Sequence, residues 1–107
     1  MEQLPLTEPV LFVLLSLAEQ PRHGYSIIKD VEQISDGRVV LSTGTLYGAL
    51  QRLLDSGWIE HFEEEQRSRD RRAYRLTARG RRSLQLEVER MKQLTKLASL
   101  RIARKGA

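Results

Sequence analysis

The sequence predicts a mainly α-helical fold with a small β-hairpin and a long C-terminal helix. Three observations predict it. Apolar residues recur at helical spacing in successive segments, two strand-like segments flank an arginine-rich turn, and the C-terminal part keeps a continuous apolar seam. A chain of 107 residues, 40% of them hydrophobic, has the size and composition of one ordinary domain.

The composition excludes several classes of protein. There is no cysteine, so disulfides, thiolate metal sites and cysteine nucleophiles are ruled out. The longest apolar run, residues 10–18, is too short to span a bilayer, and the acidic, proline-containing start is unlike a signal peptide. We therefore expect a cytoplasmic protein without a membrane segment.

The first predicted helix is apolar on nearly every side. Thr7 is a favourable N-cap, Glu8 and Pro9 suit the first turn, and the helix should run to about Gln20. A helix this apolar should contact two apolar partners. The alternative is a central core helix in a well-wrapped monomer.

Two amphipathic helices follow. After a turn at 21–22, residues 23–35 repeat isoleucine and valine at helical spacing, and 36–37 supply a stop. A short link leads to Ser42, which caps a third helix that closes at Gly57.

The third helix carries two glycines, Gly44 and Gly48, on the face opposite its leucines. Glycine costs roughly 0.5–1 kcal/mol relative to alanine inside a helix, so another structural or functional requirement must outweigh this loss of helix stability. Together with Gln51, Arg52 and Asp55 the glycines form an outward face of low relief, which something large and rigid can approach. A crossing with another helix is the alternative.

The predicted hairpin carries the positive charge of the chain. Residues 58–65 and 71–76 have the character of two strands around a polar, arginine-rich turn. From Gln66 to Arg82 there are eight arginines against the single acid Asp70, although the net charge of the whole chain is only +4. This placement is expected of a polyanion-binding protein. A solvated basic turn is the alternative.

Thr77 caps a long final helix that should run to about Arg104. Its apolar positions step by three or four residues and form a seam along the helix. The helix is longer than the small core, so its own chain has no apolar surface to cover this seam. The seam of one chain can pack on the second apolar side of the first helix of another chain, so we expect an obligate homodimer. A final helix folded back on its own domain is the alternative. The predicted interface comprises Phe12, Leu15, Leu84, Val88, Met91, Leu94, Ala98 and Ile102.

The order helix, helix, helix, hairpin is that of a winged helix-turn-helix. In that fold the third helix enters the major groove of double-stranded DNA, and the hairpin tip reaches phosphates or the adjacent minor groove. We assign residues 1–76 to this DNA-binding domain and 77–107 to a dimerisation helix, the two forming one compact unit. The predicted DNA contacts are Ser42, Thr43, Gly44, Thr45, Tyr47, Gly48, Gln51, Arg52, Arg67, Arg69 and Arg71.

Three blocks of the sequence resemble the signature strings of the PadR family of transcriptional regulators. They are HGYSIIKDVE, STGTLYGALQRLLDSGWIE and RRAYRLTARG. The resemblance covers essentially the whole chain, and one long helix after the wing is similar to the family's short subfamily. One departure is Gly48, because many members have proline after the GTLY string.

The resemblance implies a dimeric, ligand-responsive repressor in which each C-terminal helix packs on the partner's N-terminal helix. It also implies a pocket for a small-molecule effector at the dimer interface, with Phe12 and Met91 as lining residues. The leading hypothesis is a sequence-specific regulator that binds an inverted repeat. The alternative is a winged-helix interaction module whose basic hairpin binds an acidic protein.

No catalytic, metal or cofactor site is expected. His23 and His61 are isolated from any acidic or cysteine constellation and should serve structure. Tyr25 and Tyr74 are expected in the core. Pairing of the run Glu63-Glu64-Glu65 with Arg71, Arg72 and Arg75 would offset the repulsion of these acids from DNA. The alternative is that these acids restrain nonspecific binding.

Overall fold

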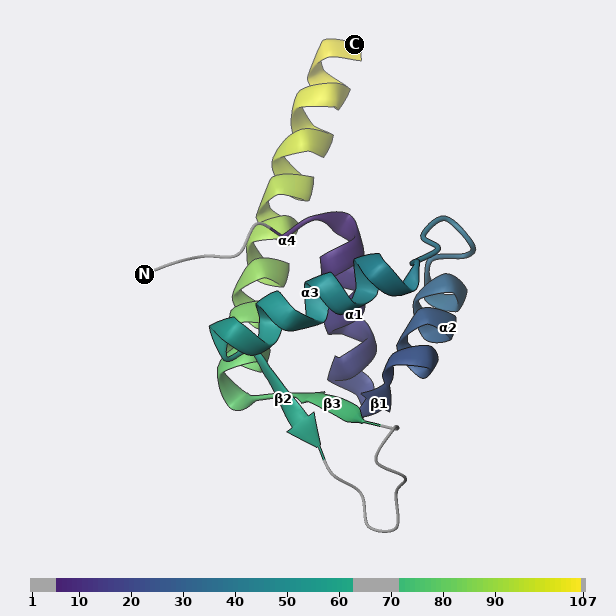
Figure 1. The fold of residues 1–107 in the computed structure, drawn as a ribbon. Helices are drawn as coiled ribbons and strands as arrows, with labels where there is room; N and C mark the ends of the chain where they lie inside the picture. Colours follow the sequence, from purple (N-terminus) through teal and green to yellow (C-terminus); the bar gives the residue numbers. More distant parts are fainter. Residues whose placement is uncertain (1–5, 63–71, 107) are drawn as a thin grey trace.

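The computed structural model describes residues 6–62 and 72–106. Three helices pack on one another beside a small sheet, and a fourth helix leaves the sheet and runs past the core (Figure 1). In chain order the elements are α1 (Glu8–Glu19), β1 (Arg22–His23), α2 (Gly24–Ile34), α3 (Thr43–Ser56), β2 (Ile59–Phe62), β3 (Ala73–Leu76) and α4 (Ala78–Gly106).

The helix ends lie where the capping residues predict them. The Val10 N–H donates to Thr7 Oγ1 at 3.4 Å at the start of α1, and the Thr45 N–H donates to Ser42 Oγ at 3.1 Å at the start of α3. Gly57 ends α3 in the left-handed conformation, with φ at 81°, which glycine adopts without strain. The caps therefore fix both ends of the third helix.

The sheet has three antiparallel strands in the order β1-β3-β2, where the sequence predicts only a two-stranded hairpin and a turn at 21–22. Arg22 of β1 pairs with Tyr74, and Ile59 of β2 pairs with Leu76. A strand of two residues is too short to show alternation, and its pairing with β3 is a long-range contact, so no local pattern marks it. The rest of the predicted hairpin, 63–71, lies outside the described residues.

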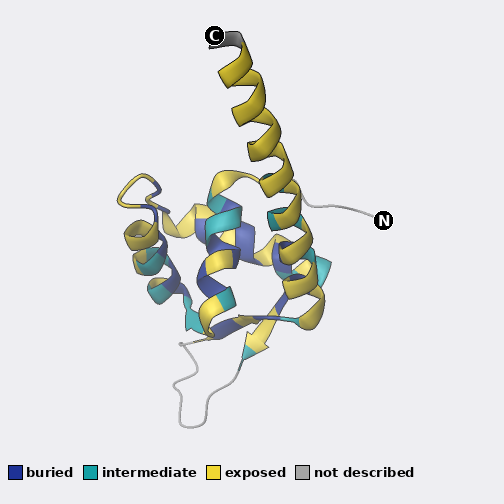
Figure 2. Cartoon of the chain, turned by 180° about the vertical axis from the view of Figure 1, so that it is seen from behind, coloured by how far each residue is buried: buried dark blue, intermediate teal, exposed yellow. Residues whose placement is uncertain are grey.

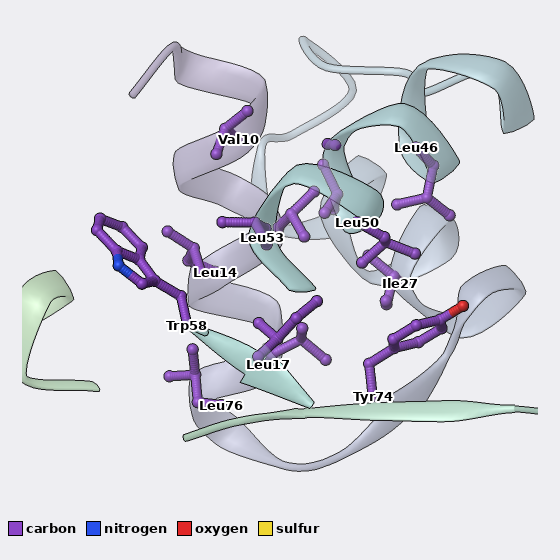
Figure 3. Packing of buried hydrophobic residues seen from close by; sticks show 14 of the residues in the cluster. Val10, Leu14, Leu17, Ile27, Leu46, Leu50, Leu53, Trp58, Tyr74 and Leu76 are labelled. Carbon is purple, nitrogen blue, oxygen red and sulfur yellow. The ribbon is translucent and has the colours of Figure 1, made fainter. Parts of the chain in front are cut away.

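The core lies between α1, α2, α3 and the sheet (Figure 3). Leu14 and Leu17 of α1 meet Leu50 and Leu53 of α3 there, and all four side chains are at most 2% exposed. Trp58, for which the sequence indicates no role, is buried in this cluster. The leucine stripe of α3 thus faces the core, as predicted.

Two arginines from other elements satisfy the C-terminal carbonyls of α1, which has no basic residue in its last turn. Arg22 Nε donates to the Ser16 carbonyl at 3.1 Å, and Arg81 Nη2 donates to the Ala18 carbonyl at 3.1 Å. Such donors replace the partners that the last turn of a helix lacks. They also tie α1 to β1 and to α4.

The long helix α4 is buried only at its beginning. Thr77 Oγ1 accepts from the Gly80 N–H at 2.9 Å at its start, and Leu84 is buried, whereas Val88 and Met91 are half-buried. From residue 92 to residue 104 every residue is exposed, and this half projects beyond the core (Figure 2). The distal seam of α4 is therefore uncovered within one chain.

One predicted core residue is at the surface. Tyr74 is buried as expected, but Tyr25 is 71% exposed, with Lys29 Nζ 5.5 Å from the centre of its ring. The expectation for Tyr25 is wrong because the buried stripe of α2 runs through Ile27 and Val31, and Tyr25 lies outside it.

Candidate nucleic-acid interface

The outward face of α3 is open along its glycines. Apart from the adjacent residues and the backbone of α3 itself, no heavy atom of the described chain lies within 4 Å of the position that a Cβ would take at Gly44 or Gly48. The opposite face, with Leu46 and Leu50, is buried. A crossing with another helix of the described chain therefore does not explain these glycines, and the low-relief face that they leave is free.

The start of α3 presents short polar side chains around this face. Ser42 Oγ donates to Thr45 Oγ1 at 3.0 Å besides capping the helix, and Ser42, Thr43 and Thr45 are all exposed. The first-turn N–H groups of a helix lack intrahelical acceptors and attract anions. Both Gln51 and Arg52 are exposed on later turns of the same helix.

Tyr47 packs against α2 at the edge of this face. Its side chain is 49% exposed, and its Cζ would lie 2.9 Å from a Cβ at Gly24. Burial, and next the neighbouring Tyr47, raise the pKa of the Tyr74 hydroxyl above 10.0, while Arg72 acts in the opposite direction. Tyr47 therefore lies at the junction of α2, α3 and the sheet, with part of its ring open to solvent.

In the wing, formed by β2 and β3, a carboxylate on one strand pairs with a guanidinium on the other. Glu60 lies opposite Arg75, and their side chains form an ion pair at 2.8 Å. The Arg75 guanidinium also lies over the Phe62 ring, 5.0 Å from its centre. Arg75 was expected to pair with the Glu63–Glu65 run, so Glu60 is the partner that the sequence analysis missed. The antiparallel register brings these two side chains together.

The remaining predicted wing residues lie outside the described residues. They are the tip arginines Arg67, Arg69 and Arg71 and the acids Glu63, Glu64 and Glu65.

The predicted dimer surface divides into a covered and an uncovered part. Phe12, Val88 and Met91 are partly buried, whereas Leu15 is 39% exposed, Leu94 57% and Ile102 72%, and Ala98 is also exposed. These residues lie on α1 and α4, which the structure brings to the same side of the core (Figure 2).

Phe12 and Met91, the predicted effector residues, do not line the depression that the structure describes. This open depression of about 430 Å³ lies elsewhere, along the C-terminal end of α2 and the turn after it, between Lys29 and Gly37. Charged and polar groups line it, so it does not resemble an apolar ligand pocket.

The two histidines occupy the sheet. His23 lies in β1 and is the N-cap residue of α2, and its Nε2 is buried without a hydrogen-bond partner in the described chain. The His61 ring lies 5.1 Å from the Tyr74 ring, centre to centre. No described helix is long and apolar enough to cross a membrane.

Sequence reasoning missed two residues that shape this region, Gly24 and Gly80, and the contact that Asp55 makes. Both glycines lie where another segment comes close, and the HGY and YRLTARG strings were the signal that could have marked them. Asp55 accepts a hydrogen bond from Gln51 Nε2 at 3.0 Å. Its spacing of four residues from Gln51 on the outward face could have indicated this contact.

Three helices with an exposed third helix beside a small antiparallel sheet define a winged helix-turn-helix protein. The sequence model of the transcriptional regulator PadR-like family matches residues 13–86. The chain belongs to this PadR-like family of transcriptional regulators.

Solved structures of other proteins are similar to this fold. A transcriptional regulator from Clostridium thermocellum has 26% identity and a TM-score of 0.72, over 89% of this chain and 96% of that chain. BpsR of Bordetella bronchiseptica, whose DNA binding is regulated by 6-hydroxynicotinic acid, has 21% identity and a TM-score of 0.65, over 85% of this chain and 58% of that chain.

A curated relative is considerably longer than this chain. An uncharacterized 37.1 kDa protein in a transposon of Streptomyces fradiae is 40% identical over 85 residues, which are 79% of this chain and 23% of that protein. The chain therefore spans less than a quarter of the length of this relative.

Proposed function

We propose that this chain is a cytoplasmic, homodimeric repressor of transcription that binds an inverted repeat in double-stranded DNA. The observation that carries the proposal is the outward face of α3, where Gly44 and Gly48 leave the backbone accessible and Gln51 and Arg52 are exposed.

This face suits a major groove. A duplex is rigid and must come close to the helix for side chains to reach base edges, and glycines remove the side chains that would hold it away. Phosphates can meet the N–H groups at the start of α3, near Thr43 and Gly44. The arginines of the wing tip then hold the backbone beside the groove.

Dimerisation is supported by the half of α4 that its own chain does not cover. Leu94 and Ile102 expose 57% and 72% of their surface, and Leu15 on α1 exposes 39%. Burying these apolar side chains against a second copy contributes about 25 cal/mol for each Å² removed from water. A two-fold dimer presents two identical α3 helices to one side of the duplex.

A small-molecule effector is part of the proposal. Phe12 of α1 and Met91 of α4 are half-buried within one chain and would lie at the boundary between two copies. BpsR of Bordetella bronchiseptica, a fold relative, has its DNA binding regulated by 6-hydroxynicotinic acid. We propose that an apolar effector between these elements changes the distance between the two α3 helices.

Selection of bound fragments from random duplex DNA tests the proposal. We expect one palindromic sequence to be enriched, with the affinity for it falling as salt concentration rises. A promoter that carries the selected sequence should be silenced when the protein is present. Enrichment of no sequence, together with salt-dependent binding of an acidic protein, would instead identify an interaction module.

A further inference from the structure

Asp55 is a carboxylate on the outward face of α3, where an acid is costly. It lies in the last turn of the helix, and negative charge is disfavoured at this end of the helix dipole. On a face that approaches DNA it is also repelled by phosphates. Some interaction must offset these two effects.

The structure supplies one partner, the side-chain amide of Gln51. Gln51 Nε2 donates to Asp55 Oδ1 at 3.0 Å, across four residues of the same helix, and both side chains are exposed. An ionised carboxylate can only accept hydrogen bonds. Asp55 therefore selects the amide orientation that turns Nε2, and not Oε1, toward the end of α3.

We propose that Asp55 determines the base specificity of α3 by holding the Gln51 amide in one orientation. The inference rests on the proposed function, namely that this face reads DNA. One N–H of Nε2 is occupied by Asp55, while the second N–H and Oε1 remain available as a fixed donor and acceptor pair.

This fixed pair matches adenine and mismatches guanine. In the major groove adenine presents N7 as acceptor and the N6 amino group as donor, whereas guanine presents two acceptors, N7 and O6. A held glutamine bonds both adenine atoms but leaves its Oε1 facing O6 of guanine. An amide that is free to rotate loses part of this discrimination.

The test compares Asp55→Ala with the parent protein on three duplexes: the selected operator, the operator with guanine at the adenine that Gln51 reads, and a random duplex. That adenine is the position at which Gln51→Ala loses discrimination. Asp55→Ala should bind random DNA more tightly, because a negative charge is gone. Its preference for adenine over guanine should fall by at least about fivefold, the low end of what a bidentate contact contributes.

Two controls separate orientation from charge. Glu60→Gln also removes one negative charge, but Glu60 lies on the wing and pairs with Arg75, not with Gln51. This variant should therefore leave the adenine preference unchanged. In the Gln51→Ala background, Asp55→Ala should alter affinity for all three duplexes by the same factor. An unchanged adenine preference in Asp55→Ala, or an equal fall in the Gln51→Ala background, would overturn the proposal.

A readout without DNA separates this proposal from the proposed function. In the free protein, NMR should show the Gln51 side-chain amide protons shifting when Asp55 is replaced by alanine, and unaffected by Glu60→Gln. No shift would overturn the proposal even if the operator is bound tightly. A clear shift in a protein that prefers no duplex would overturn both the proposal and the proposed function.

Discussion

At the scale of single residues, the glycines of this chain have two distinct roles. A Cβ at Gly80 would lie 2.8 Å from the carbonyl carbon of Trp58, so the start of α4 packs directly on backbone. At Gly48, by contrast, a Cβ would meet no atom of the described chain within 4 Å beyond its adjacent residues and the backbone of α3 itself. The first glycine is required by the fold, whereas no packing contact in the described chain requires the second.

Gly80→Ala should therefore destabilise the protein by about 3 kcal/mol, the upper end for overpacking, because backbone cannot move aside as a side chain can. Gly48→Ala is the matched control and should stabilise the fold by roughly 0.5–1 kcal/mol through helix propensity. Urea unfolding measures both. If Gly80→Ala unfolds at the same urea concentration as the parent protein, the close packing of α4 on Trp58 is wrong.

Ionisation of Tyr74 makes the free energy of unfolding depend on pH in the alkaline range. Burial first, and then Tyr47, raise its pKa above the ordinary value of 10.0 in the folded protein. The stability that this shift contributes is fully present below pH 10.0 and is lost as pH rises through the folded-state pKa.

In Tyr74→Phe this contribution is absent, so its free energy of unfolding should fall less than that of the parent protein above about pH 10. Urea unfolding of both proteins over a pH series supplies the comparison. A difference between them that stays constant through the alkaline range would contradict the assignment.

At the scale of elements, α3 and the wing have different parts in the proposed DNA binding: α3 recognises bases, and the wing contacts phosphates. Fixed by Ser42 at its start and by Gly57 at its end, α3 presents Gln51 in a defined position. The wing contributes positive charge, which attracts any nucleic acid. These two contributions respond differently to sequence and to salt.

Gln51→Ala should weaken binding to the operator while its affinity for random DNA and its salt dependence stay nearly unchanged. Arg67→Ala, Arg69→Ala or Arg71→Ala should weaken binding to both DNAs alike and reduce the salt slope by about one unit. Binding to both duplexes over a salt series gives all of these values. Equal losses on the two DNAs for Gln51→Ala would assign that residue to phosphate contact.

The elements themselves could be predicted from the sequence to different degrees. The helices follow from periodicity and caps because both are local, and α1, α2 and α3 end within two residues of the predicted bounds. Strand β1 could not be predicted, since two residues become a strand only by pairing with β3. The contact of Gly80 with Trp58 also joins segments that are separated along the chain, so periodicity and caps do not predict this partner, although the YRLTARG string marks the glycine.

The candidate site was predictable where it depends on one helix. The outward position of Gly44, Gly48 and Gln51 follows from helical geometry alone, and the structure agrees. The environment of Tyr47 depends on how α2 and the sheet pack around α3, which no single segment encodes. Tyr25 was misplaced because an aromatic residue in a signature block need not lie on the buried stripe of its helix.

At the scale of the whole molecule, α4 is longer than the core that supports it. Its first turns pack on β3 and donate a hydrogen bond to α1, whereas every residue from 92 to 104 is exposed in the single chain. The proposed dimer follows from this imbalance.

Leu94→Glu should convert the proposed dimer to folded monomers, because a charge buried in the seam costs several kcal/mol while Leu94 is exposed in the single chain. Leu86→Glu is the matched control, since Leu86 is also exposed but lies two residues from Leu84, about 200° around α4 and therefore outside the seam. Light scattering gives the mass and circular dichroism the helix content. A Leu94→Glu protein that remains a dimer would remove the seam from the interface.

The central claim, that two copies present two α3 helices to one duplex, is tested most directly by footprinting on the selected operator with the complex mass measured in parallel. We predict two chains on each duplex and protection of two inverted half-sites, with centres roughly 34–36 Å apart or a multiple of that spacing. Protection of one asymmetric half-site by a single chain would contradict it.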